Sequence, residues 1–246
     1  MKAAEKNLLL KIARNPEPQD IFDKLKKGKT VDSSYTEIVK AQIDFGLKQM
    51  ELPEPWSGHL SKAKLMFIGT NPAVADLNKE QVPTAKWDDE DICDFFDNRW
   101  INFSKPGALN PTWIGMIKFT DLLIENCQKL KGCNKIHDGG SYSSTDMNKL
   151  ADLVVCVDCV HCRSDNSVGV DDCLGIEVET WLPSILEKFT GNVIVLHGAK
   201  AKRYADFVKE NIPREDVIVV QTSHLSPISG ESDDERKKNL LKQLKR

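Results

Sequence analysis

The sequence predicts an α/β fold: a three-layer α/β/α sandwich with a central four-stranded parallel sheet. Four short apolar runs are spaced along the chain, and segments with helical periodicity separate them. Unbroken apolar character is typical of strands that are buried on both faces, as in a parallel sheet. Strands that alternate with helices join through right-handed crossovers, which place helices on both faces of the sheet.

Two amphipathic segments and a turn-rich stretch precede the first apolar run. Their apolar spacing predicts helices at about 18–29 and 34–50, and Pro and Gly predict turns at 53–58. We expect 1–60 to be a helical extension packed on a core at 61–230, with 231–246 as a C-terminal helix. The chain of 246 residues is therefore expected to form a single domain.

The core elements follow in a regular order. The expected strands are 64–68, 153–157, 193–196 and 217–220, and the expected helices begin after Pro111 and at about 177–189 and 200–211. The helix after Pro111 is indicated by apolar residues that recur every three or four positions, and the polar stretch 139–144 indicates a loop. The last helix has a clear start, because Ser232 and Glu235 form a capping box.

Composition narrows the class of protein. The 34 Lys and Arg residues are balanced by 37 Asp and Glu residues, so bulk charge does not indicate nucleic-acid binding and a DNA partner needs a local basic face. No apolar run is long enough for a secretory signal or a membrane span. We therefore expect an intracellular protein without a membrane partner, cytoplasmic if prokaryotic, with a nuclear location also open if eukaryotic.

Polar loops follow two of the predicted strands and define the candidate site. The loop after the first strand contains Gly69, Thr70, Asn71 and Pro72, and the loop after the last strand contains Ser223, His224, Ser226 and Pro227. In parallel α/β sheets, ligands bind outside the carboxyl ends of the strands. Both loops are therefore candidates for one binding crevice.

Three segments resemble the uracil-DNA glycosylase superfamily. The run Gly69-Thr70-Asn71-Pro72-Ala73 resembles its G-x-N-P-G loop, and 193–201 resembles its third strand with a G-x-x-A helix start. The run Ser223-His224-Leu225-Ser226-Pro227 resembles its H-P-S-P loop. The motifs occur in the same order and spacing, and the resemblance covers about 64–227.

The resemblance implies a DNA repair glycosylase that hydrolyses the N-glycosidic bond of uracil or a related deaminated base. Such an enzyme flips the base out of the duplex and, when monofunctional, uses water as the nucleophile. Asn71 is expected to hold this water, and His224 to donate a hydrogen bond to the departing base. Because an Asn amide takes no proton, catalysis depends on stabilisation of the leaving base. The expected partner is DNA with a damaged or deaminated base, bound by a monomer.

Further contacts are assigned in the same way. The expected base-binding residues are Gly69, Thr70, Pro72, Thr84, Trp87 and Asp158, and the expected DNA-binding residues are Ser223, Ser226, Ile228, Lys200, Lys202 and Arg203. Thr84 departs from the family pattern, which has a stacking Phe there, and Trp87 is a candidate replacement. Asp158 stands where the family has an Asn that reads uracil. These departures leave an alternative: a catalytically inactive nucleic-acid or nucleotide-binding protein on the same fold.

The seven cysteines are the remaining feature. Their odd number in a chain without a secretory signal indicates reduced thiols or metal ligands. Cys156, Cys159, Cys162 and Cys173 have a spacing that resembles an iron–sulfur or zinc ligand run, although no Cys precedes Cys93 to supply the family's N-terminal pair. Hydrolysis itself requires no cofactor. An iron–sulfur cluster or zinc ion stays open beside buried free thiols.

Overall fold

The computed structural model describes residues 1–73, 82–99, 111–226 and 229–245. The chain forms two compact units, which are described separately. Unit 1 comprises Met1–Trp56, Thr70–Asp97 and Asp158–Ile185, and unit 2 comprises Ser57–Gly69, Asn98–Val157 and Leu186–Arg246. The single-domain organisation stays a prediction.

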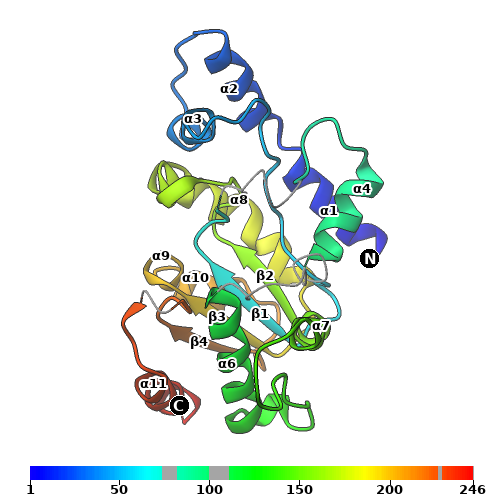
Figure 1. The fold of residues 1–246 in the computed structure, drawn as a ribbon, viewed down its shortest axis with the longest axis vertical. Helices are drawn as coiled ribbons and strands as arrows, with labels where there is room; N and C mark the ends of the chain where they lie inside the picture. Colours follow the sequence, from blue (N-terminus) through cyan, green and yellow to red (C-terminus); the bar gives the residue numbers. More distant parts are fainter. Residues whose placement is uncertain (74–81, 100–110, 227–228, 246) are drawn as a thin grey trace. The chain divides into compact units, whose positions relative to one another are not determined.

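A four-stranded, all-parallel sheet in the order β2-β1-β3-β4 forms the centre of unit 2 (Figure 1). The strands are β1 (Leu65–Gly69), β2 (Val154–Asp158), β3 (Val193–His197) and β4 (Ile218–Thr222). Leu65 pairs with Val193, and Val193 pairs with Ile218. The four apolar runs predicted these strands to within one or two residues, because β1 and β3 are buried along their whole length.

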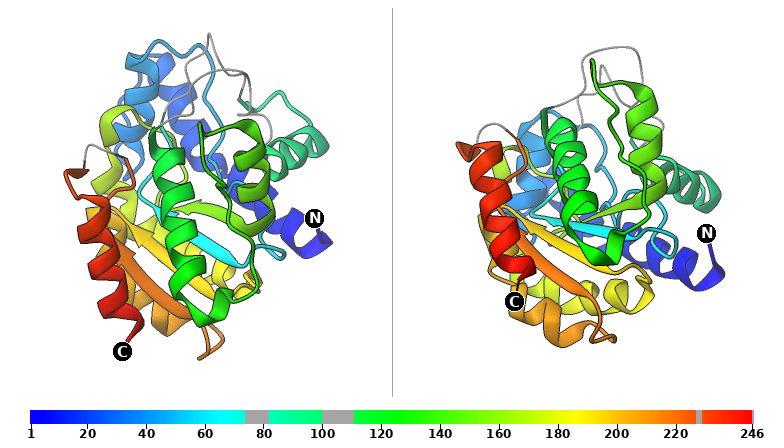
Figure 2. Two further views of the ribbon diagram at one scale, coloured as in Figure 1. Left: turned by 60° about the horizontal axis from the view of Figure 1, so that its bottom comes forward. Right: turned by 90° about the horizontal axis from the view of Figure 1, so that it is seen from below.

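Helices cover both faces of the sheet (Figure 2). One face carries α6 (Pro111–Asn126), α7 (Ser144–Leu153) and α11 (Asp233–Leu244), and the other carries α9 (Ala199–Lys202) and α10 (Ala205–Asn211). The core on the first face contains Phe67 of β1, Phe119 of α6, Leu150 of α7 and Leu240 of α11. This arrangement confirms the predicted α/β fold.

Local signals explain where two of these helices begin. The predicted capping box at α11 is present, since the Ser232 hydroxyl accepts from the Glu235 backbone N–H while the Glu235 carboxylate accepts from the Ser232 backbone N–H. Ser143 and Asp146 form a second capping box at α7. That helix was not predicted, and the expected loop at 139–144 ends at its cap. The expected helix at 200–211 is divided into α9 and α10.

Unit 1 is built mainly from helices. They are α1 (Ala3–Ala13), α2 (Pro16–Lys26), α3 (Thr36–Asp44), α4 (Asp89–Asp97), the short 3-10 turn η2 (Asp165–Ser167) and α8 (Val170–Lys188), whose last residues belong to unit 2. The second and third end earlier than predicted because Gly28 and Gly46, with φ of 70° and 98°, turn the chain out of the helical conformation. A further short turn, η1 (Gln128–Leu130), follows α6 in unit 2. No helix in the described ranges is long and apolar enough to cross a membrane.

Candidate functional site

The strand order places a topological switch at the carboxyl edge of the sheet in unit 2. β1 and β3 are neighbours, yet the chain leaves β1 toward β2 and leaves β3 toward β4. Ligands in open α/β sheets bind outside the carboxyl ends of the strands at such a point. Gly69 ends β1, His197 ends β3, and His224 follows β4. These three positions define the candidate site of unit 2.

His224 is fixed by its neighbour Ser226. Its Nδ1 lies 2.8 Å from the Ser226 hydroxyl and accepts from the Ser226 backbone N–H at 3.2 Å. Because a backbone N–H can only donate, Nδ1 is the acceptor and a neutral ring carries its proton on Nε2. Partial burial, with the nearby Arg236 guanidinium, lowers the pKa of His224. His224 is therefore a neutral imidazole at neutral pH and can donate a hydrogen bond from Nε2.

Arg236 of α11 holds the loop that carries His224. It is buried, and its Nη2 donates to the His224 carbonyl at 3.3 Å and to the Ser229 hydroxyl at 3.3 Å. Its Nε lies 3.4 Å from Glu231, which also accepts from the Ser223 hydroxyl. Sequence reasoning missed Arg236, because a basic residue in a highly charged helix usually lies on the surface.

Helix α6 fixes the same loop from the other side. A Cβ atom at Gly115 would lie 1.8 Å from the carbonyl oxygen of Leu225, the residue that follows His224. Only glycine therefore permits this approach of helix and loop. Leu225 is itself buried in the core.

His197 is a buried histidine that the sequence did not single out. Its ring centroid lies 5.6 Å from that of His224 and 6.2 Å from that of Phe67. Within the described residues, its Nδ1 has no hydrogen-bond partner, and an unmet buried group costs about 1–3 kcal/mol of stability. Burial, with a contribution from His224, lowers the pKa of His197 to about 3. No signal in the sequence indicated His197, because it is the last residue of an apolar run.

The low pKa of His197 predicts a pH dependence of stability. The ring is neutral in the fold, and its pKa rises from about 3 to the ordinary 6.5 on unfolding. The unfolded chain therefore binds more protons between these values, so the free energy of unfolding falls as the pH falls through this window. His197→Phe removes this contribution and leaves His224 in place. When the pH falls from about 6 to about 5, the free energy of unfolding of the parent should fall by about 1 kcal/mol more than that of the variant. Urea unfolding at both pH values measures it, and a constant gap between the two proteins would contradict it.

In unit 1, Asn71 is held by two hydrogen bonds. Its side-chain oxygen accepts from the Ser167 hydroxyl at 2.9 Å, and its side-chain nitrogen donates to the Pro72 carbonyl at 2.9 Å. Ser167 and the preceding Asn166 have φ of 58° and 50°, a left-handed conformation that is unfavourable for residues other than glycine. The amide orientation is thereby defined, with a second lone pair left on the oxygen. Sequence reasoning missed Ser167.

The loop that carries Asn71 is bonded along its length to the segment 160–164. The Thr70 carbonyl accepts from the Val160 backbone N–H at 2.9 Å, and the Pro72 carbonyl accepts from the Ser164 backbone N–H at 3.1 Å. Arg163 extends this ladder by donating to the Ala73 carbonyl at 3.0 Å. These bonds hold the loop against the segment 160–164 within unit 1.

Arg163 is itself part of a buried charge cluster. Its guanidinium donates to Glu54 at 2.6 Å and lies 3.8 Å from Glu51. All three residues are more than nine-tenths buried. A buried ion pair needs all its members, because a single charge left without a partner is strongly destabilising.

The other expected base-binding residues are spread over unit 1. Thr84 forms an isolated antiparallel bridge with Glu51, and the Trp87 ring meets the Phe95 ring edge-on at 5.7 Å. Asp158 is the half-buried last residue of β2. Pro227 and Ile228, of which Ile228 was expected to bind DNA, lie outside the described residues.

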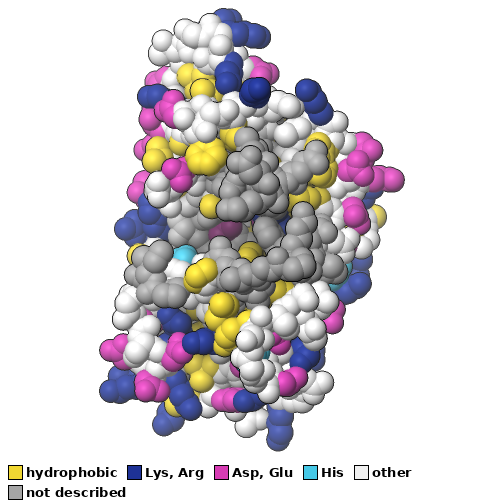
Figure 3. All heavy atoms as spheres, viewed as in Figure 1, with side chains coloured by type: hydrophobic (Ala, Val, Ile, Leu, Met, Phe, Trp, Pro, Cys, Tyr) yellow, Lys and Arg dark blue, Asp and Glu magenta, His cyan; other side chains and the backbone are white. Residues whose placement is uncertain are grey.

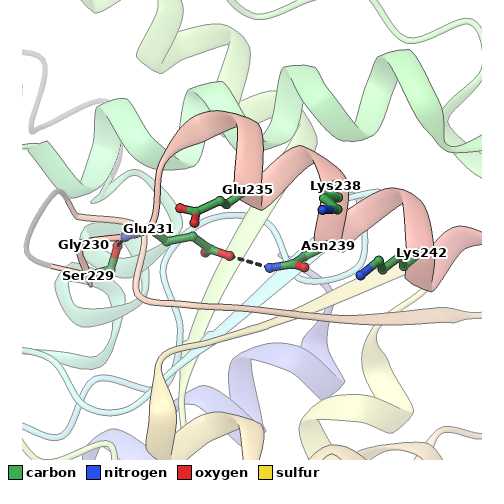
Figure 4. Close-up of a pocket in the computed structure, with 7 residues that line it drawn as sticks. All are labelled: Ser229, Gly230, Glu231, Glu235, Lys238, Asn239 and Lys242. Atoms are coloured by element: carbon green, nitrogen blue, oxygen red, sulfur yellow. Dashed lines mark hydrogen bonds between the residues drawn. The ribbon is translucent and has the colours of Figure 1, made fainter.

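Two open hollows adjoin the His224 loop on the α11 side. One, of about 410 Å³, is lined by Lys202, Ser223 and Lys242 among others. The second, of about 510 Å³, is shown in Figure 4. Its lining residues are Ser229, Gly230, Glu231, Glu235, Lys238, Asn239 and Lys242. The sequence singled out Lys202 with Lys200 and Arg203, and the structure adds Lys238 and Lys242.

The two hollows share Glu231, Asn239 and Lys242 and form one groove, which carries charges of both signs. Around α11, at the lower left of Figure 3, Lys and Arg side chains lie next to Asp and Glu side chains. The acids of the groove have partners of their own: Glu231 accepts from Asn239 at 2.8 Å, and Glu235 accepts from Ser232 at 2.8 Å. The groove lysines are therefore its available positive charges toward an anion.

The four cysteines of the predicted ligand run do not form a metal site in the described residues. Cys156 belongs to unit 2, whereas Cys159, Cys162 and Cys173 belong to unit 1. Within the described ranges, no group of three or more His, Cys, Asp or Glu side chains is placed to hold an ion. Burial raises the pKa of Cys173 to about 12 and raises the pKa of Cys162 well above its ordinary value. The residues present therefore do not fit a cluster or zinc ion, and the cofactor stays a prediction without support here.

Comparisons with known proteins add no assignment. Neither a scan against models of protein families nor a search of curated proteins gives a match.

Proposed function

We propose that this protein is a monofunctional DNA glycosylase that hydrolyses the N-glycosidic bond of uracil or a related deaminated base. The observation that carries the proposal is the state of His224: a neutral imidazole, fixed by Ser226 and Arg236 at the carboxyl edge of the sheet. It occupies the position that the H-P-S-P resemblance assigns to the residue that contacts the departing base.

A neutral donor suits this chemistry. Cleavage of the glycosidic bond leaves the electron pair of that bond on the base and positive charge on the sugar. A fixed N–H donor stabilises the oxygen on which the base's negative charge accumulates, at no cost of reorganisation during the reaction. An imidazolium would be more acidic, but partial burial and the nearby Arg236 guanidinium disfavour the charged form. His224 therefore donates a hydrogen bond without transferring its proton.

Asn71 supplies the second function. Its side-chain oxygen keeps one lone pair beyond the bond from Ser167, and this lone pair accepts a hydrogen from the attacking water. Water adds to the sugar carbon, the base leaves with the bonding electrons, and the water proton passes to solvent or to the base. The ladder of bonds from Arg163 and Ser164 keeps the loop in one position.

The groove lysines support binding to phosphates. Replacing Lys202, Lys238 and Lys242 together with Ala should weaken binding to all DNA sequences alike. The slope of log affinity against log salt concentration should become shallower by about one for each phosphate that the variant no longer neutralises. Fluorescence anisotropy at several salt concentrations measures the slope. The matched control replaces Lys62, Lys64 and Lys131, exposed lysines near the amino end of β1 or after η1. An unchanged slope in the first variant would remove the groove from the DNA interface.

The activity is tested on oligonucleotides that carry one uracil, hypoxanthine or xanthine, in single and double strands. Excision leaves an abasic site, which alkali converts to a strand break that is visible on a denaturing gel. We expect breaks at the modified base alone. Tight binding without breaks would instead favour the binding-protein alternative, to which Thr84 and Asp158 point.

A further inference from the structure

Two buried polar atoms without partners belong to paired residues on neighbouring strands of unit 2. They are the Nδ1 atom of His197 and the hydroxyl oxygen of Thr222, and neither has a hydrogen-bond partner within the described part of the chain. His197 and Thr222 are a register pair of β3 and β4, each at the last position of its strand. Both side chains lie on the sheet face that carries Phe67 and Val220, because side chains alternate along a strand.

This pair is unusual for its surroundings. The other residues of β3 are Val193, Ile194, Val195 and Leu196, all fully buried and apolar. Buried polar groups are normally hydrogen-bonded, and a local break of this rule is expected at functional positions. The two atoms lie at the carboxyl edge of the sheet, and His197 contacts the ring of His224. The two unmet groups therefore lie where the core meets the candidate site of unit 2.

The chemistry of the pair limits the ligand. A nitrogen of a neutral imidazole donates or accepts according to the tautomer, and a threonine hydroxyl can do both. Neither group carries a charge, so the pair does not suit a phosphate. With His197 as the donor and Thr222 as the acceptor, the pair matches the lactam edge of a nucleobase, in which a carbonyl oxygen lies next to a ring N–H. Cytosine and adenine present an amino group next to a bare ring nitrogen, which is the opposite pattern.

We propose that His197 and Thr222 read the lactam edge of the flipped base, with His197 donating to the carbonyl oxygen and Thr222 accepting the ring N–H. This inference rests on the proposed function and names its substrate class. Deamination of cytosine or adenine converts the amino-bearing edge into a lactam, which the pair meets in this arrangement. Because both groups can also exchange donor and acceptor roles, other contacts must exclude the parent bases. Thymine and guanine share the lactam edge, so other contacts must exclude them.

The test compares His197→Phe and Thr222→Val, which remove the polar atoms and keep similar shapes, with Thr222→Ser, which keeps the hydroxyl. We expect single-turnover excision of uracil to fall at least about tenfold in the first two and to stay within about threefold in the serine variant. Thermal unfolding separates the roles. Removal of unmet polar atoms leaves the melting temperature unchanged or higher, whereas a structural role would lower it together with the rate. His59→Phe, in the turn before β1, is the matched control.

Binding of the free base gives a readout that does not need cleavage. Titration of isotope-labelled protein with free uracil should shift the imidazole signals of His197, and both deletion variants should weaken this binding at least about tenfold. If the parent excises uracil and both variants excise it equally well, the inference fails and the proposed function stands. If the parent excises nothing yet uracil shifts the His197 signals, the proposed function fails and the assignment of His197 to the base stands. Absence of both excision and base binding would overturn both.

Discussion

Replacing Asn71 or His224 with Ala should lower the single-turnover rate of base excision by about a hundredfold or more, on the order of 3 kcal/mol for each residue. Asn71 orients the water and His224 stabilises the departing base, and both interactions strengthen in the transition state. Affinity for DNA with a modified base should change much less. Rates come from a gel assay with enzyme in excess, and affinities from anisotropy.

Two control variants make this result specific. Asn134→Ala and His59→Ala remove the same kinds of side chain at other positions, both in unit 2, and should leave the rate unchanged. Circular dichroism should show that the Asn71 and His224 variants fold like the parent, because strand-end loops contribute little packing. Full excision by both catalytic variants would remove the two residues from the mechanism.

Replacing Arg163 with Leu should lower the free energy of unfolding by about 3–5 kcal/mol. The substitution keeps much of the buried volume but leaves Glu51 and Glu54 without their shared cation in the interior of unit 1. It also removes the bond to the Ala73 carbonyl, which belongs to the Asn71 loop. Urea unfolding followed by circular dichroism measures the change.

The control for this variant is Arg203→Leu. Arg203 is exposed after α9, so its replacement should change the unfolding free energy by less than about 0.5 kcal/mol. Arg163→Lys should fall between the two, because an ammonium keeps the charge but lacks the planar fork that meets Glu54. A decrease below about 1 kcal/mol in Arg163→Leu would contradict the account of the buried cluster.

The sheet could be predicted from the sequence because its strands leave a local trace. The inner strands β1 and β3 are buried on both faces and read as continuous apolar runs. The edge strands β2 and β4 are only partly buried but also begin with apolar runs. The start of α11 could also be predicted from a local signal, because Ser232 and Glu235 of its capping box lie three residues apart. α1 was missed because its three leucines are consecutive and show no helical spacing, and α7 because its apolar residues follow a polar stretch rich in Gly and Ser.

The candidate site could be predicted only in part. Asn71 and His224 belong to short loops with a recognisable order of residues, whereas the groups that hold them come from distant parts of the sequence. Ser167 contacts Asn71 across 96 positions, and Arg236 contacts the His224 carbonyl across 12. His197 became visible only when the fold showed its Nδ1 without a partner among the described residues. Such contacts depend on tertiary structure and leave no periodic pattern.

Release of the free base tests the central claim most directly. Duplex DNA with one uracil is incubated with excess parent enzyme, and the small-molecule fraction is analysed by mass spectrometry while the strand is assayed for abasic sites. We predict one free uracil for each abasic site formed, and disappearance of both products in His224→Ala. Recovery of the strand with its uracil intact, with hypoxanthine and xanthine also retained in parallel reactions, would contradict the assignment of this protein as a glycosylase.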